Sequence, residues 1–119
     1  MEKTFLEEIK ELIEESRKAR VSRETIDKCF RIYHENISRD DITNEEKVYL
    51  CIMNGLAYVK LGSYLPADSS YLLARRYANE SKDEKLLLLV GYEIIYFYAN
   101  SKEWVMENRS DSLRRFSEF

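Results

Sequence analysis

Apolar residues recur every three or four positions through the first third of the chain, and this spacing is typical of amphipathic helices. The first stripe consists of Phe5, Leu6, Ile9, Leu12, Ile13 and Ala19. The second stripe consists of Ile26, Cys29, Phe30, Tyr33 and Ile37. Thr4 followed by Glu7 has the spacing of a capping box, and Ser22 is a common N-cap residue. The pattern predicts a hairpin of two helices, the first ending near Arg20 and the second near Ile37.

Further capping signals mark the middle of the chain. Thr43 and Glu46 again have capping-box spacing, and the helix they begin carries apolar residues on two opposed sides. Such a helix is either central in the fold or lines a groove. Gly62 suits the end of this helix, and Pro66 suits the first turn of the next one. These signals predict a second hairpin.

The most apolar stretch, residues 86–99, predicts a fifth helix. Ser81 and Glu84 give it a capping-box signal. It has about 14 residues and contains Glu93, whereas a membrane span needs about 20 apolar residues, so we expect a buried helix and no membrane span. Trp104 begins a sixth helix, which Leu113, Phe116 and Phe119 continue unless residues 108–112 divide it. The chain 1–119 is therefore predicted to be one all-α domain of about six helices in three antiparallel hairpins.

Small and aromatic residues stand at fixed distances between residues 48 and 81. They are Gly55, Tyr58, Gly62, Tyr64, Ala67, Tyr71 and Ala74. This pattern resembles one copy of the tetratricopeptide repeat, in which two helices cross at small residues. The positions where the repeat usually has tryptophan, leucine and proline hold Cys51, Asn54 and Asn79. The resemblance implies a right-handed, tetratricopeptide-like stack of hairpins.

By this resemblance, the third and fifth helices line a concave groove that holds a peptide or helix of another protein. The third helix supplies Tyr49, Ile52, Met53, Leu56 and Lys60. A shift of 36 residues places Gly91 where Gly55 stands, and the fifth helix then supplies Lys85, Leu89, Tyr92 and Tyr96. Tyrosine and methionine suit an adaptable contact surface, and lysines at its edges suit a carboxylate. The alternative is that the first or last helix covers these side chains as core.

The composition is typical of a mostly helical single domain. The chain has 119 residues, one proline, three glycines and 34% charged residues. Its formal charge of −3 does not indicate a polyanion-binding surface. The N-terminus lacks the charged-then-apolar order of a signal sequence, and the two cysteines lack metal-binding spacing. We therefore expect a cytoplasmic protein.

Candidate catalytic residues are few. His34 is the only histidine, and no second nitrogen or sulfur ligand lies three or four positions from it. Cys29 and Cys51 lie on apolar stripes, where buried and inert thiols are expected. No glycine-rich phosphate loop occurs in the sequence. We therefore expect that the protein is not an enzyme and binds no cofactor or metal. Its expected role is that of an adaptor, small chaperone or regulatory subunit. A small helical hydrolase or nuclease is the least supported alternative.

Positive charge gathers around the first predicted turn, at Arg17, Lys18, Arg20, Arg23, Lys28 and Arg31. Phosphate contacts need such a patch, so the main alternative is a small helical subunit of a nucleoprotein assembly that contacts nucleic acid here. Cations also collect at helix ends because the helix dipole favours them there. Two arginine pairs suit contacts to another subunit and leave a homo-oligomer open: Arg75 with Arg76, and Arg114 with Arg115.

Overall fold

The computed structural model describes residues 2–108, and six helices make up most of this part of the chain. They are α1 (Phe5–Ser16), α2 (Arg23–Asn36), α3 (Asn44–Lys60), α4 (Tyr64–Ser81), α5 (Glu84–Asn100) and α6 (Lys102–Glu107). No strand occurs among the described residues. The prediction of an all-α protein is therefore confirmed.

Three of the helices begin at the caps that the sequence predicts. The Thr4 hydroxyl accepts a hydrogen bond from the backbone N–H of Glu7, and the Ser22 hydroxyl accepts one from Thr25. At α3 the capping box is complete, because Thr43 accepts from the Glu46 N–H while the Glu46 carboxylate accepts from the Thr43 N–H. These bonds satisfy backbone donors that a helix start leaves without partners.

Two predicted boundaries are wrong. α1 ends at Ser16 rather than near Arg20, and the intervening residues form an exposed turn. The Ser81 hydroxyl bonds back to the carbonyl of Ala78 and so belongs to the end of α4, which Lys82 closes at a φ of +58°. Asp83 is the actual N-cap of α5, because its carboxylate accepts the N–H of Lys85 at 2.9 Å.

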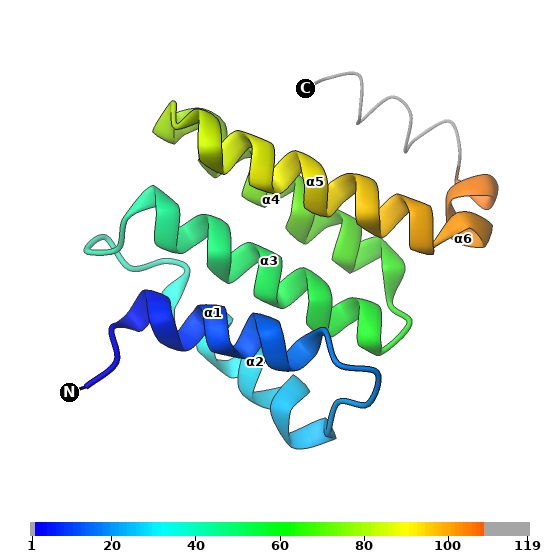
Figure 1. Cartoon of the computed structure of the whole chain (residues 1–119), viewed down its shortest axis with the longest axis horizontal. Coiled ribbons are helices and arrows are strands. Elements are labelled where there is room, and N and C mark those ends of the chain that lie inside the picture. Colours follow the sequence, from blue (N-terminus) through cyan, green and yellow to red (C-terminus); the bar gives the residue numbers. More distant parts are fainter. Residues whose placement is uncertain (1, 109–119) are drawn as a thin grey trace.

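The helices form two layers around α3. In Figure 1, α1, α3 and α5 lie side by side in one layer, with α2 and α4 behind them. α3 packs against α1, α2, α4 and α5, and every residue from Leu50 to Ala57 is buried. The apolar residues on both sides of this helix therefore serve a central position, which is one of the two interpretations that the sequence allows.

α3 and α4 approach closely at the small residues of the predicted crossing. A Cβ atom added at Gly55 would lie 3.0 Å from the ring carbon Cζ of Tyr71, so the ring occupies the space that a larger residue would need. Ala67 and Ala74 are fully buried in α4. Beside them, the Asn54 amide donates to the Ser70 hydroxyl at 2.8 Å, so a buried hydrogen bond also joins the two helices. This arrangement is compatible with a tetratricopeptide-like hairpin.

The last predicted segment is described only in part. Trp104 lies in α6 and packs against Tyr64 and Phe97 with ring centroids 6.4 and 5.8 Å apart. The predicted continuation of this helix and its arginine pair lie outside the described residues, at Leu113, Arg114, Arg115, Phe116 and Phe119. Within residues 2–108, no helix combines the length and the apolar character that crossing a bilayer requires.

Candidate functional site

The predicted groove is closed along its centre. Ile52, Met53 and Leu56 are only 1%, 0% and 8% exposed, because α3 is surrounded by other helices, including α1 on the side of the expected groove. These three side chains belong to the core, which is the alternative that the sequence left open. α1 closes this side with its own buried residues Ile9 and Ile13.

A smaller hollow remains where α1, α3 and α5 meet, which we call the inner hollow. Its volume is about 410 Å³, and it is lined by Lys10, Ile13, Glu14, Arg17, Tyr49, Ile52, Leu89 and Glu93. Three of these residues are in the predicted groove: Tyr49, Ile52 and Leu89. The Lys10 ammonium lies 4.9 Å from the centroid of the Tyr49 ring, within the range of a cation–π contact. α1 and its C-cap residue Arg17 thus supply four of the eight residues that line this hollow.

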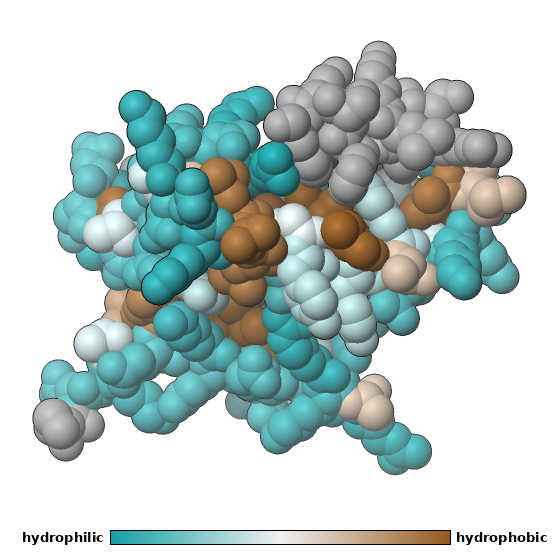
Figure 2. Space-filling view, turned by 45° about the horizontal axis from the view of Figure 1, so that its top comes forward, coloured by the Kyte–Doolittle hydropathy of each residue, from teal (hydrophilic) through white to brown (hydrophobic). Residues whose placement is uncertain are grey.

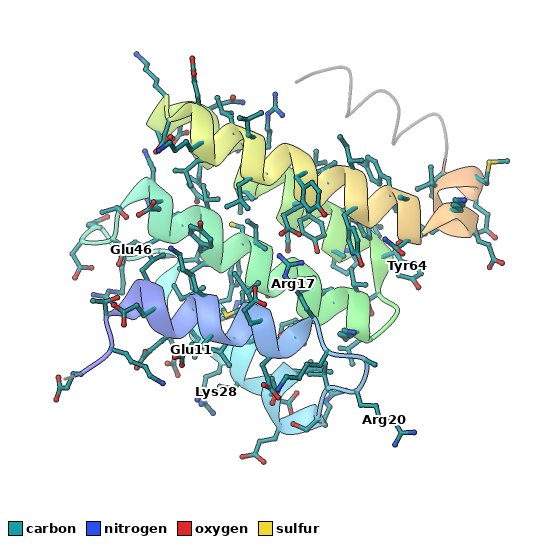
Figure 3. The ribbon with its side chains drawn as sticks, viewed as in Figure 1. Glu11, Arg17, Arg20, Lys28, Glu46 and Tyr64 are labelled. Carbon is teal, nitrogen blue, oxygen red and sulfur yellow. The ribbon has the colours of Figure 1, made fainter. Side chains whose placement is uncertain are left out.

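An ion pair lies in the wall of the inner hollow. Glu93, in the middle of α5, is 2% exposed, and both of its carboxylate oxygens accept hydrogen bonds from the Arg17 guanidinium. Figure 3 shows Arg17 reaching from the end of α1 toward α5. Burial alone would lower the pKa of Arg17, but the hydrogen bonds and the charge of Glu93 raise it above its ordinary value. The pair joins α1 to α5 and neutralises the buried carboxylate.

The two predicted edge lysines have different surroundings. The Lys60 ammonium donates to the backbone carbonyl of Lys18 at 2.8 Å, so it fastens the end of α3 to the turn after α1. Lys85 is exposed at the start of α5, on the side away from α1. Lys85 alone of the two remains beside an open apolar surface.

α5 exposes a row of large apolar side chains on its outward side, which we call the α5 outer face. Leu88, Tyr92, Ile95 and Tyr96 are 75%, 66%, 58% and 52% exposed, and the Tyr92 and Tyr96 rings stack at 6.3 Å between centroids. An outer hollow of about 800 Å³ lies along this face, lined by Arg75, Lys85, Leu87, Leu88, Leu89, Gly91, Tyr92 and Ile95. In Figure 2, where α5 has come forward, hydrophobic surface gathers over this part of the molecule between hydrophilic margins.

The prediction of α5 as a buried helix is therefore wrong for one of its two sides. Its inward side is buried, at Leu86, Val90, Ile94 and Phe97. Its outward side exposes Leu88 and Ile95, which lie in the stretch 86–99 that the sequence predicts to be buried, together with the predicted site residues Tyr92 and Tyr96. The signal for this second side was present in the sequence, because residues 88, 92 and 95 form a separate stripe beside that of 86, 90, 94 and 97.

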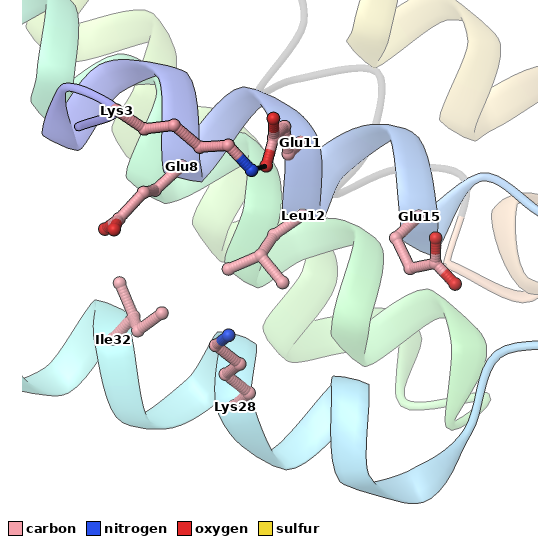
Figure 4. A pocket seen from close by; sticks show the side chains of 7 residues that line it. All are labelled: Lys3, Glu8, Glu11, Leu12, Glu15, Lys28 and Ile32. Atoms are coloured by element: carbon pink, nitrogen blue, oxygen red, sulfur yellow. Dashed lines mark hydrogen bonds and ion pairs between the residues drawn. The ribbon is translucent and has the colours of Figure 1, made fainter. Parts of the chain in front are cut away.

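Three of the six cations of the basic region are paired with carboxylates. Arg17 bonds to Glu93, Lys18 lies 2.7 Å from Glu15, and an ion pair of 3.0 Å joins Arg23 to Asp27. The shallow hollow between α1 and α2 in Figure 4 contains Lys28, but it is lined by Lys3, Glu8, Glu11, Leu12, Glu15, Lys28 and Ile32, with carboxylates in the majority among the charged groups. Nucleic-acid phosphates would therefore meet both signs of charge on this surface.

The two thiols are buried and held in their neutral form. Burial raises the pKa of Cys29, whose sulfur lies 3.6 Å from the Ser16 hydroxyl, and raises the pKa of Cys51 to about 12. His34 is exposed and meets the Tyr33 ring edge-on at 5.3 Å between centroids. Among residues 2–108, no three side chains of the metal-binding types come together. The described residues thus present apolar surface rather than a cluster of reactive groups.

The geometry defines an all-helical, two-layered protein with an apolar face on its last long helix. Comparisons with known proteins add no relationship, since no family model, curated protein or solved structure matches the chain. The resemblance to a tetratricopeptide repeat therefore stands on the residues quoted for it and stays a prediction.

Proposed function

We propose that the chain is a non-catalytic protein–protein interaction module that holds a helical segment on the α5 outer face. The main support for this proposal is one continuous row of exposed apolar side chains, which consists of Leu88, Tyr92, Ile95 and Tyr96. Together these four side chains expose roughly 500 Å². Apolar patches beyond a few hundred Å² are uncommon on monomeric proteins and usually mark interaction sites.

The spacing of the exposed residues supports a helix as the bound element. Along α5 the exposed positions include Lys85, Leu88, Tyr92, Ile95 and Ala99. Their separations alternate between three and four residues, which is the a/d spacing of a coiled-coil seam. A helix with its own apolar stripe can lie along such a seam and bury both stripes. An adaptor, a small chaperone or a regulatory subunit of the cytoplasm would use the face in this way.

Nucleic-acid contact is not proposed as a second function, because the ion pairs of the basic region leave few cations for phosphate. Within residues 2–108, no ion pair involves Arg20, Lys28 or Arg31, and three cations form a smaller patch than the six that the sequence suggested. Arg20 points away from the helices in Figure 3. Such a patch is typical of an ordinary solvated surface.

Affinity capture from a native lysate tests the proposal. The immobilised wild-type chain is compared with Tyr92→Asp, which places a charge in the seam, and with the control Leu65→Asp. Leu65 is 55% exposed on α4 and does not line the outer hollow. We expect a set of proteins retained by the wild type and by Leu65→Asp and lost with Tyr92→Asp. Retention that is equal in all three would contradict the proposal.

A further inference from the structure

We infer that the partner of the α5 outer face is a second copy of the chain, whose own α5 lies antiparallel across it. This inference rests on the proposed function, because it uses the same face. It commits to a two-fold symmetric pair, in which each copy presents the same residues to the other. Three features of this face support such a pair: the seam, the hole beside Gly91 and the exposed area.

The seam is complementary to itself in an antiparallel pair. In antiparallel coiled coils, the a positions of one helix face the d positions of the other. With the two-fold axis between residues 93 and 94, Tyr92 of one copy faces Ile95 of the other, and Leu88 faces Ala99. Each layer then combines a larger with a smaller side chain, which is how packed layers interdigitate. Lys85 lies beyond these layers at each end and keeps its charge in water.

Gly91 makes a hole in the seam that the described residues leave empty. A Cβ atom added at this position would meet no atom within 4 Å. Gly55 of α3 stands 36 residues earlier at the corresponding position, and there the ring of Tyr71 occupies the space beside the glycine. A glycine inside a helix reduces helix stability, and the packing within residues 2–108 gives no reason for it at position 91. A close approach from outside would give one.

The hole has the shape that a coiled-coil partner uses. Each knob of a coiled coil inserts among four residues of the facing helix at positions i, i+3, i+4 and i+7. Leu88, Gly91, Tyr92 and Ile95 have this spacing, and all four line the outer hollow. With the axis placed as above, the hole is level with Ile95 of the second copy. Ile95 is 58% exposed and is therefore available as the knob.

The area sets the expected strength of the pair. If each copy contributes roughly 500 Å², the pair buries about 1,000 Å², which is close to the lower limit for a specific interface. Self-association should therefore be weak and reversible, with a dissociation constant on the order of 10–100 μM.

Sedimentation equilibrium of the full chain between about 5 and 500 μM tests the pair, a range that brackets the expected dissociation constant. We expect a monomer–dimer equilibrium for the wild type and for the control Leu65→Glu, and a monomer throughout for Tyr92→Glu. Gly91→Leu should weaken dimerisation at least tenfold, because the leucine side chain fills the hole. Nonspecific hydrophobic association would instead become stronger with the added apolar side chain. Circular dichroism checks that each variant is folded.

Disulfide trapping tests the register. When Tyr92→Cys and Ile95→Cys chains are mixed under oxidising conditions, we expect the mixed disulfide to form faster than either homodimer. Homodimeric disulfides that predominate in the mixture would indicate a parallel pair and would overturn the proposed orientation. Cys29 and Cys51 are buried and do not compete.

A wild-type chain that stays monomeric at the highest concentration overturns the inference, and so does a Tyr92→Glu chain that dimerises like the wild type. The proposed function is judged separately by the capture experiment. If the chain is monomeric and Tyr92→Asp still abolishes capture, the face binds another protein. If the substitutions at Tyr92 change neither result, both the inference and the proposed function are wrong.

Discussion

At the scale of single residues, the glycines at 55 and 91 occupy similar places in their helices and have opposite surroundings. Gly55→Ala would press a methyl group against the buried Tyr71 ring, at 3.0 Å from Cζ. This overpacking should cost about 1–3 kcal/mol, against a gain of about 1 kcal/mol in helix propensity, so we expect a net loss of up to about 2 kcal/mol in unfolding free energy. Gly91→Ala meets no neighbour and should gain about 0.5–1 kcal/mol.

Urea unfolding at low micromolar concentration, below the dissociation constant expected for the proposed pair, measures the stability change that each glycine substitution causes. Equal effects of the two substitutions would show that Tyr71 yields to the added methyl group at position 55.

The ion pair between Arg17 and Glu93 gives a second prediction at this scale. Arg17→Met removes the partner of a carboxylate that is 2% exposed. Since Arg17 itself is partly exposed, we expect a loss of about 2–3 kcal/mol, less than for a fully buried pair. The double variant Arg17→Met with Glu93→Met should regain most of this loss, because no charge is then left in the core. Denaturant titration of the two single variants and the double variant completes the cycle, and losses that simply add would contradict the coupling.

The buried Cys51 thiol gives a pH dependence. Its pKa is about 12 in the folded chain, against an ordinary value of 9.0, so the folded state holds its proton while the unfolded state releases it. Stability from this group is complete below about pH 9 and is lost as the pH rises toward 12. Between pH 9 and 10 we expect Cys51→Ala to reduce the downward slope of the unfolding free energy by up to about 1.4 kcal/mol per pH unit. An unchanged slope, measured by urea unfolding at each pH, would contradict a protected thiol.

At the scale of the elements, local signals predicted the helices well, and long-range packing decided the site. Thr4, Ser22 and Thr43 act within four residues of themselves, so the sequence alone reveals their caps. At α5 two cap signals lie side by side, and Asp83 is the one used because Ser81 ends α4. Periodicity separates the faces of a helix but cannot tell which neighbour covers a face.

The candidate site illustrates this limit. α3 is apolar on two sides, and only the position of α1 shows that Ile52, Met53 and Leu56 are covered. The same reasoning selected Tyr92 and Tyr96 on α5, which are exposed. It did not select Leu88 or Ile95 for the site, since a run of consecutive apolar residues hides the second stripe.

A matched pair of charged substitutions tests the difference between the two helices. Leu56→Asp places a carboxylate among buried side chains and should cost more than about 3 kcal/mol, enough to unfold much of the population. Tyr92→Asp changes an exposed position and should alter stability by less than about 0.5 kcal/mol. Thermal unfolding followed by circular dichroism distinguishes the two. A strongly destabilised Tyr92→Asp would show that the α5 outer face is part of the packed core.

At the scale of the whole molecule, the two edges of the front layer differ in chemistry. Every exposed residue of α1 is charged, so this edge of the layer has a polar surface. The α5 edge exposes leucine, isoleucine and tyrosine instead. A polar outer face keeps the end of a stacked helical array soluble, and in the proposed pair a second copy would cover the apolar edge of α5. The apolar edge of the layer is the same surface as the seam on α5.

The charge distribution of the whole molecule disfavours tight binding of nucleic acid. The chain carries a formal charge of −3, and half of the six cations of the basic region are paired with Glu15, Asp27 and Glu93. At about 0.15 M salt we expect a dissociation constant above about 100 μM for single-stranded and duplex oligonucleotides, because in the basic region only Arg20, Lys28 and Arg31 are outside ion pairs. Fluorescence anisotropy with labelled oligonucleotides at two salt concentrations measures this. Tight binding that falls steeply with salt and is lost in Arg20→Gln would instead assign the function to the basic region.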